Sequence, residues 1–263
     1  MLNIGGVEVG GTNPCRMVAE ISNAHNGDLQ RAFRLIEAAK HCGADFVKFQ
    51  CYTPDELVAL RGEGKAPGEW GEQGWSMRSL YEKAQTQLDW FPSLFKHAEF
   101  VGIVAFSSVF GEESLRVLRA VDCPAYKIAR LDNQSLQLAT IARMAGKPVL
   151  VSSSGEKVPR IGAKPVDGLL YCPPGYPTAP ADVHLPEFGD RSDGGQWENW
   201  LGLSSHCLDA ALPVAAVSRG AKLLEYHFML DDQPSELESN ISLYADDFDA
   251  MVSDVRRTEA LLA

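Results

Sequence analysis

Short apolar segments alternate with amphipathic segments along most of the chain. Eight segments are predicted to be strands because they are short, apolar and bounded by turn residues: 16–22, 44–50, 103–108, 125–130, 148–153, 166–172, 201–206 and 222–228. Helical segments lie between many of them, at 29–42, 77–101, 112–121, 135–145, 208–219 and 246–262. Strands and helices that alternate at this count predict an α/β fold with one parallel (β/α)8 TIM barrel, formed by a single domain over residues 1–263.

Three segments depart from the regular alternation. Residues 1–15 carry several glycines and predict a short N-terminal hairpin before the barrel. Residues 51–76 are long and glycine-rich, which predicts an active-site loop. The link 154–166 is too short and too rich in Pro and Gly for a crossover helix, so either the barrel lacks an outer helix between its fifth and sixth strands or the strand assignment is wrong.

Polar side chains stand at or just beyond the predicted C-terminal strand ends, where barrels of this class carry their chemistry. In chain order they are Glu20, Lys48, Gln50, Ser107, Ser108, Lys127, Arg130, Asp132, Ser152, Ser153, Tyr176, Ser204, His206 and His227.

Two histidines occupy matched positions in consecutive strands. His206 ends one apolar run and His227 ends the next, with an Ala-rich helical segment between them. Parallel strands joined in this way have adjacent C-terminal ends, so both imidazoles are expected to face a common point. Two imidazoles suit a divalent transition metal and leave coordination positions for substrate and water. The alternative is that each is a hydrogen-bonded histidine at a strand end.

Two lysines lie inside apolar strands. Lys48 and Lys127 are flanked by apolar residues, and a buried ammonium is costly unless it meets an anion. Together with the nearby serines they suggest a phosphate-binding site. The alternative is an ion pair with a core carboxylate, for which Glu20 is the obvious partner.

Composition limits the classes of partner. Lys and Arg number 24 against 35 Asp and Glu, and the formal net charge of −11 argues against a nucleic-acid-binding protein while leaving a small anionic substrate open. The six cysteines show no C-x-x-C spacing and are interpreted as reduced, buried thiols of a cytoplasmic protein. We expect no membrane span, because no apolar run approaches 18 residues.

An ordered set of short motifs resembles a known family. AEISNAHNGD, GADFVKFQCYTPDEL, CPAYKIA, GKPVLVSSS, YCPPGYPT and EYHFMLD occur in this order within residues 16–262. They resemble the sialic acid synthase family, which comprises N-acetylneuraminate, legionaminate and pseudaminate synthases. The resemblance implies a (β/α)8 barrel that condenses phosphoenolpyruvate with the aldehyde form of an N-acetylated hexose. It further implies Mn²⁺ or Mg²⁺ as cofactor, a sialic-acid-like 2-keto acid and phosphate as products, and a homodimer.

The resemblance also assigns roles by position. It implies metal binding by His206 and His227. It places phosphoenolpyruvate on Lys48, Ser108, Lys127, Ser152 and Ser204. It places the sugar near Gln50 and Tyr176. It offers three carboxylates for proton transfer, Glu20, Asp132 and Glu238. Arg130 either adds a phosphate contact or occludes the site.

Departures from the family pattern concern the acceptor side. Members usually continue into a small antifreeze-like domain, which we do not expect in a chain ending at 263. Ser205 replaces an aspartate before the metal histidine, Gly175 replaces an asparagine, and a changed segment at 236–239 leaves Glu238 as the carboxylate substitute. The acceptor sugar therefore stays open. So do two alternatives: another metal-dependent barrel enzyme, such as a sugar isomerase or a different phosphoenolpyruvate synthase, and a degenerate barrel that binds a ligand without turnover.

Overall fold

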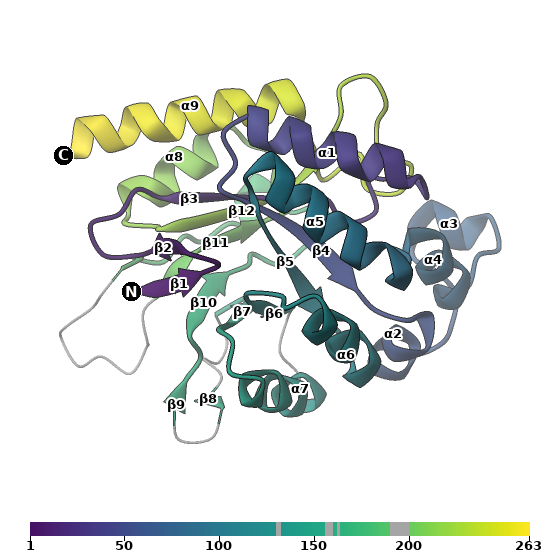
Figure 1. Cartoon of the computed structure of the whole chain (residues 1–263). Coiled ribbons are helices and arrows are strands. Elements are labelled where there is room, and N and C mark those ends of the chain that lie inside the picture. The colour runs from purple at the N-terminus through teal and green to yellow at the C-terminus, as the bar shows by residue number, and fades with distance from the viewer. Residues whose placement is uncertain (130–132, 156–159, 162–163, 190–199) are drawn as a thin grey trace.

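A parallel barrel forms the body of the protein in the computed structural model, which describes residues 1–129, 133–155, 160–161, 164–189 and 200–263 (Figure 1). The strands are hydrogen-bonded in the order β11-β10-β7-β6-β5-β4-β3-β12, and pairing of β11 with β12 closes the ring. The eight barrel strands are β3 (Arg16–Glu20), β4 (Phe46–Cys51), β5 (Val104–Val109), β6 (Tyr126–Ile128), β7 (Val149–Ser153), β10 (Gly168–Tyr171), β11 (Trp200–Ser205) and β12 (Leu223–Met229). The predicted eight-stranded TIM barrel is confirmed, with strand boundaries shifted by a few residues.

Helices cover the outside of the barrel, with α1, α5 and α9 on the upper side in Figure 1. The outer helices are α1 (Leu29–His41), α5 (Phe91–Val101), α6 (Glu112–Ala120), α7 (Asn133–Met144), α8 (Ala211–Ser218) and α9 (Ala245–Leu262). The sequence signals at their ends are visible in α1. The Asp28 side chain accepts hydrogen bonds from the backbone N–H groups of Gln30 and Arg31, and Gly43 adopts a φ of 80° just after the helix.

Two of the three predicted irregularities are present, the N-terminal hairpin and the missing crossover helix. Strands β1 (Leu2–Ile4) and β2 (Val7–Val9) pair antiparallel as the expected N-terminal hairpin. Between β7 and β10, the described residues form a second small hairpin, β8 (Arg160–Ile161) with β9 (Lys164–Pro165), in place of a crossover helix. The strand assignments on both sides of this link are correct. The next link contains the short 3-10 helix η2 (Pro180–Asp182).

The prediction of a loop over 51–76 is wrong in part. This segment contains α2 (Pro54–Arg61) and α3 (Gly68–Glu72). Helix α2 begins with a capping box, in which the Thr53 side chain accepts from the Glu56 N–H and the Glu56 carboxylate accepts from the Thr53 N–H. The two side chains thereby satisfy two backbone N–H groups at the start of the helix that have no partner within it.

Other local differences concern helix and strand breaks. The helical material predicted over 77–101 is divided into α4 (Met77–Ala84), the 3-10 helix η1 (Leu88–Trp90) and α5. A short strand, β13 (Ser242–Tyr244), was not predicted and pairs parallel with β12, so that Ser242 lies opposite His227.

Apolar side chains fill the space between the strands and the helices. Phe46 of β4 and Phe106 of β5 are fully buried and meet edge to face, with ring centroids 5.7 Å apart. All six cysteines are free thiols; five are buried, as predicted, and Cys172 is only partly buried. Within the described part of the chain, no helix has both the length and the apolar character needed to cross a bilayer.

Candidate active site

The first buried lysine, Lys48, is held by partners on both neighbouring strands. Parallel register places Glu20 of β3 opposite Lys48 of β4, and their side chains form a buried ion pair. The Lys48 Nζ also donates to Ser108 Oγ on β5, at 3.0 Å. Burial lowers the pKa of Lys48, but the carboxylates of Glu20 and Glu225 outweigh burial and hold this pKa above its ordinary value. Lys48 is therefore a cation that faces both a carboxylate and a hydroxyl.

The second lysine, Lys127 on β6, reaches across the barrel to β11 and β12. Its Nζ lies 2.5 Å from Glu225 Oε1 and donates to Ser204 Oγ at 3.1 Å. Ser204 in turn donates to Glu225 Oε1 at 2.8 Å, and Lys48 Nζ lies 3.8 Å from the same oxygen. Burial raises the pKa of Glu225, but Lys127 and Lys48 outweigh it and lower this pKa to about 2. Both lysines are thus paired with core carboxylates, as the alternative interpretation expects, and each also hydrogen-bonds to a serine. Phosphate binding by the two lysines stays a prediction.

Glu225 is a site residue that the sequence analysis missed. A glutamate between Leu224 and Tyr226 in an apolar strand is as unusual as the two lysines. It stands two residues before His227, and alternation along a strand places both side chains on one face. This signal was available in the sequence. Its second oxygen, Oε2, is buried and has no hydrogen-bond partner among the described residues.

The two histidines lie together at the end of the barrel, as predicted. His227 is the fifth residue of β12, His206 follows β11 directly, and their ring centroids are 5.4 Å apart. The ring of Tyr176 lies 4.6 Å from that of His206 and 6.1 Å from that of His227. Three residues from separate βα units therefore surround one point.

Glu238 joins this cluster from the segment between β12 and β13. One of its oxygens lies 3.3 Å from His227 Nδ1, and the other accepts a hydrogen bond from the Tyr176 hydroxyl. Burial raises the pKa of Glu238, but His227 and the hydrogen bonds outweigh it and lower this pKa to about 2. Conversely, burial lowers the pKa of His227, and Glu238 outweighs burial and raises it above its ordinary value. Glu238 is therefore an anion that fixes one imidazole.

The two imidazoles fit the metal that the family resemblance implies. Burial, followed by the charges of His227 and Lys127, lowers the pKa of His206 to about 3, so His206 is neutral at physiological pH, the form that ligates metals. A carboxylate on one ring nitrogen of His227 is the usual arrangement around a metal-binding histidine. Among the described residues, no group of three His, Cys, Asp or Glu side chains forms a ready metal cluster. Metal binding by His206 and His227 therefore stays a prediction.

The other predicted site residues divide into three cases. Gln50 donates from its amide to Glu20 Oε1 and to Ser22 Oγ, both at 3.0 Å, and so lies beside the first lysine pair. Ser152 is buried on β7, which β6 and β5 separate from Lys48 on β4. Arg130 and Asp132 lie outside the described residues, and their predicted roles stay predictions.

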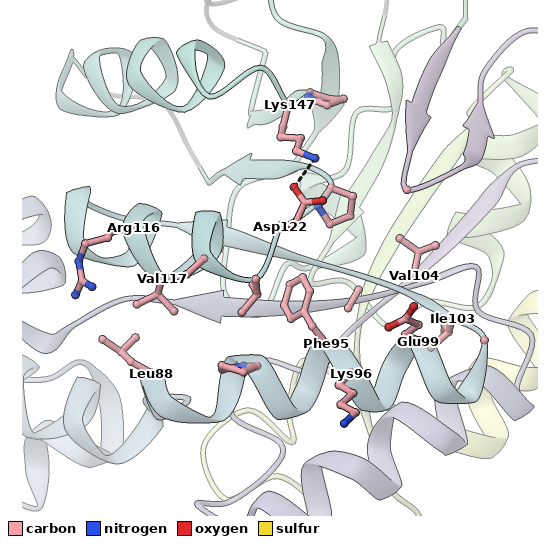
Figure 2. A pocket seen from close by; sticks show the side chains of 18 of the residues that line it. Leu88, Phe95, Lys96, Glu99, Ile103, Val104, Arg116, Val117, Asp122 and Lys147 are labelled. Atoms are coloured by element: carbon pink, nitrogen blue, oxygen red, sulfur yellow. Dashed lines mark ion pairs between the residues drawn. The ribbon is translucent and has the colours of Figure 1, made fainter.

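A separate hollow lies away from these residues. It has a volume of about 1120 Å³ and lies between α5 and α6 over the outer side of β5 (Figure 2). Phe95, Val104 and Val117 line it, and the Lys147–Asp122 ion pair borders it. It contains none of the predicted site residues.

Comparison with known proteins identifies relatives over nearly the whole chain. The sequence pattern of the NeuB family matches residues 35–263. The chain is 34% identical over 258 residues to a pseudaminic acid synthase of Campylobacter jejuni, covering 94% of this chain and 74% of that protein. It is 30% identical over 265 residues to the human N-acetylneuraminate-9-phosphate synthase, covering 97% of this chain and 73% of that one. The expectation of an enzyme of the synthase type agrees with these names.

A solved structure agrees with the sequence relatives. The N-acetylneuraminic acid synthetase of Leptospira borgpetersenii superposes with a TM-score of 0.83 at 25% identity, over 100% of this chain and 90% of that one. The spore coat polysaccharide biosynthesis protein of Bacillus subtilis superposes with a TM-score of 0.75 over 99% of this chain. The match over residues 35–263, together with a relative above 30% identity, shows that this chain belongs to the NeuB family.

Proposed function

We propose that this protein condenses phosphoenolpyruvate with the open aldehyde form of an N-acetylated hexose, giving a sialic-acid-like 2-keto acid and phosphate. One observation carries the proposal: the barrel brings together two adjacent imidazoles and two buried lysines that hydrogen-bond to serines, and Glu20 lies opposite both His227 and Lys48 in the strand register. The names of the relatives support it, since they include pseudaminic acid, N-acetylneuraminate-9-phosphate and N,N'-diacetyllegionaminic acid synthases.

Lys48 and Lys127 are the groups that would hold the phosphate and carboxylate of phosphoenolpyruvate. Each ammonium already has a serine hydroxyl beside it, Ser108 for Lys48 and Ser204 for Lys127. An anion that approaches the lysines can therefore accept from ammonium and hydroxyl donors together. In the proposed complex, the enol carbon of an anion held in this way would face the histidines, oriented for attack.

Charge balance supports a divalent cation at the histidines. The two lysines are already matched by Glu20 and Glu225, and Glu238 adds a further negative charge close by. A multiply charged phosphoenolpyruvate would find little net attraction there without another cation. Mn²⁺ or Mg²⁺ held by His206 and His227 would supply that charge and polarise the acceptor carbonyl as a Lewis acid.

The covalent sequence then follows from the positions of the two substrates. Carbon 3 of phosphoenolpyruvate attacks the aldehyde carbon, which forms the new C–C bond and builds positive character at carbon 2. Water adds to carbon 2, and the tetrahedral intermediate breaks its C–O bond to phosphate and becomes the 2-keto acid.

Proton transfer falls to Glu20 among the described carboxylates. Glu225 and Glu238 are already held by Lys127 and His227, and Glu20 is preferred for its position. Glu20 stands between Lys48 and the Gln50 amide at the end of β3, close to where the reacting carbons would lie. Asp132 keeps its predicted role as a second candidate.

The test is a phosphate-release screen with phosphoenolpyruvate, Mn²⁺ and a panel of N-acetylated hexoses that includes the acceptors of the named relatives. We expect phosphate release that needs both an acceptor and a divalent metal, and its loss in His206→Ala. A sugar isomerase would convert the acceptor without releasing phosphate. A barrel without turnover would release none with any acceptor, and either result would refute the proposal.

A further inference from the structure

The segment between β12 and β13, residues 230–241, carries Glu238 and lies beside the start of α1, where Figure 1 shows it as the yellow-green loop. Its position is fixed by the first βα unit of the barrel, about 200 residues earlier in the chain. The contacts involve one buried arginine on α1 and two asparagines in the loop that precedes α1.

Arg31 is the centre of these contacts. Its side chain is almost fully buried, at 1% exposure. Its Nε donates to the Ala24 carbonyl at 2.6 Å, one terminal nitrogen donates to Gln233 Oε1 at 2.7 Å, and the other donates to the Gln233 carbonyl. The guanidinium thus joins the loop after β3 to the segment after β12.

Two asparagines continue this connection toward Glu238. Asn26 donates to the Pro234 carbonyl at 3.1 Å and accepts from the Glu236 N–H at 3.0 Å. The Ser235 hydroxyl donates to Asn23 Oδ1 at 2.8 Å and accepts from the Glu238 N–H at 3.2 Å. Residues 233–236 therefore each have a partner in the first βα unit, and Glu238 is held indirectly through Ser235.

A buried guanidinium is an unusual choice for stability alone. All three of these bonds go to neutral oxygens, so the desolvated charge gains no direct carboxylate pair from them. A planar group with donors in a fixed fork does, however, fix the separation of two backbone segments more closely than an apolar side chain can.

We propose that Arg31 is a positioning residue, which holds the 230–241 segment so that the Glu238 carboxylate lies on His227 Nδ1. The expected change in kcat rests on the proposed function, whereas the expected change in the order of the 230–241 segment rests on the contacts alone. Loss of the guanidinium frees Gln233, loosens the segment, and lets Glu238 move away from His227. The imidazole then loses the carboxylate that orients it.

The test compares Arg31→Met with Arg34→Met in the full chain. Arg34 lies on the same helix and contacts the same segment, but through a half-exposed ion pair with Asp232 at 3.1 Å. For Arg31→Met we expect the Glu236 and Glu238 amides to exchange hydrogen about tenfold faster. We also expect the Kd for Mn²⁺ alone to rise about tenfold and kcat to fall about tenfold, while the KM for phosphoenolpyruvate stays within about twofold. Arg34→Met should leave all four quantities within about twofold.

A second variant decides the outcome if Arg31→Met does not fold. Gln233→Leu removes one acceptor of the guanidinium from an exposed position and should change exchange, Kd and kcat in the same direction by a smaller factor. The proposal is overturned if a folded Arg31→Met or Gln233→Leu keeps all three near wild type, or if Arg34→Met reproduces the changes. If the wild type releases no phosphate with any acceptor, the proposed function fails. The positioning role of Arg31 is then tested by the amide exchange of Glu236 and Glu238 alone.

Discussion

Glu225 gives the most direct test of the buried charge network. In Glu225→Gln the side chain keeps its shape, but Lys127 loses its ion pair at 2.5 Å and Lys48 loses a carboxylate at 3.8 Å. The folded state lowers the pKa of Glu225 from 4.5 to about 2. At about 1.4 kcal/mol for each pKa unit, this corresponds to roughly 3 kcal/mol of folding free energy at pH 7. Removing one partner of a buried pair typically costs about 3–5 kcal/mol, which agrees.

The pH dependence follows from the sign of this change. A carboxylate whose pKa is lowered on folding contributes stability above its unfolded pKa, and that stability is lost as the pH falls through 4.5 toward about 2. Urea unfolding should therefore show Glu225→Gln destabilised by about 3 kcal/mol at pH 7 and by about half of that or less near pH 3. Asp122→Asn is the control, because it removes an exposed carboxylate paired with Lys147 and should cost under about 1 kcal/mol. A pH-independent difference, or one no larger than that of the control, would contradict the buried ion-pair network.

Three further predictions address the rest of the barrel. Ser108→Ala removes the hydroxyl beside Lys48. In steady-state kinetics it should raise the KM for phosphoenolpyruvate about tenfold while kcat changes little. An unchanged KM would exclude Ser108 from substrate binding. His25 is buried against Thr86, and burial lowers its pKa from 6.5 to about 4, so the unfolded state binds the proton first as the pH falls below 6.5. Between pH 7 and pH 5, the free energy of unfolding measured in urea should therefore fall by about 2 kcal/mol more in the wild type than in His25→Gln. An equal fall in both proteins would refute this. Gly202→Ala would place a methyl group 1.9 Å from the Leu223 carbonyl oxygen of the adjacent strand. This clash should destabilise the barrel by about 3 kcal/mol, measured as a lower Tm. The matched control is Gly64→Ala, where a methyl group meets nothing within 4 Å.

The barrel could be predicted from the sequence because its strands and outer helices have distinct hydrophobic periods. The missed elements are those whose signals were local and weak. Helix α2 depends on the Thr53–Glu56 capping box within a glycine-rich stretch, and β13 has three residues and depends on pairing with β12.

The candidate site was predictable to the extent that strand ends determine it. Lys48, Lys127, His206 and His227 come together because parallel register places them there. The contacts of Glu238 with His227 and Tyr176 were not predictable, because they depend on how two irregular segments fold back over the barrel end.

Ring closure sets the order in which this protein can mature on the ribosome. Strand β3 is synthesised early, yet one of its edges receives its partner only when β12, some 200 residues later, has emerged. At a synthesis rate of about 5–20 residues per second, that edge stays open for roughly 10 s or more. An open strand edge can pair with other chains, so this edge is exposed to wrong pairing while the chain is being synthesised. For the same reason, Lys127 can pair with Glu225 only after β12, the last barrel strand, has been translated. This buried ion pair is therefore one of the last contacts of the barrel to form.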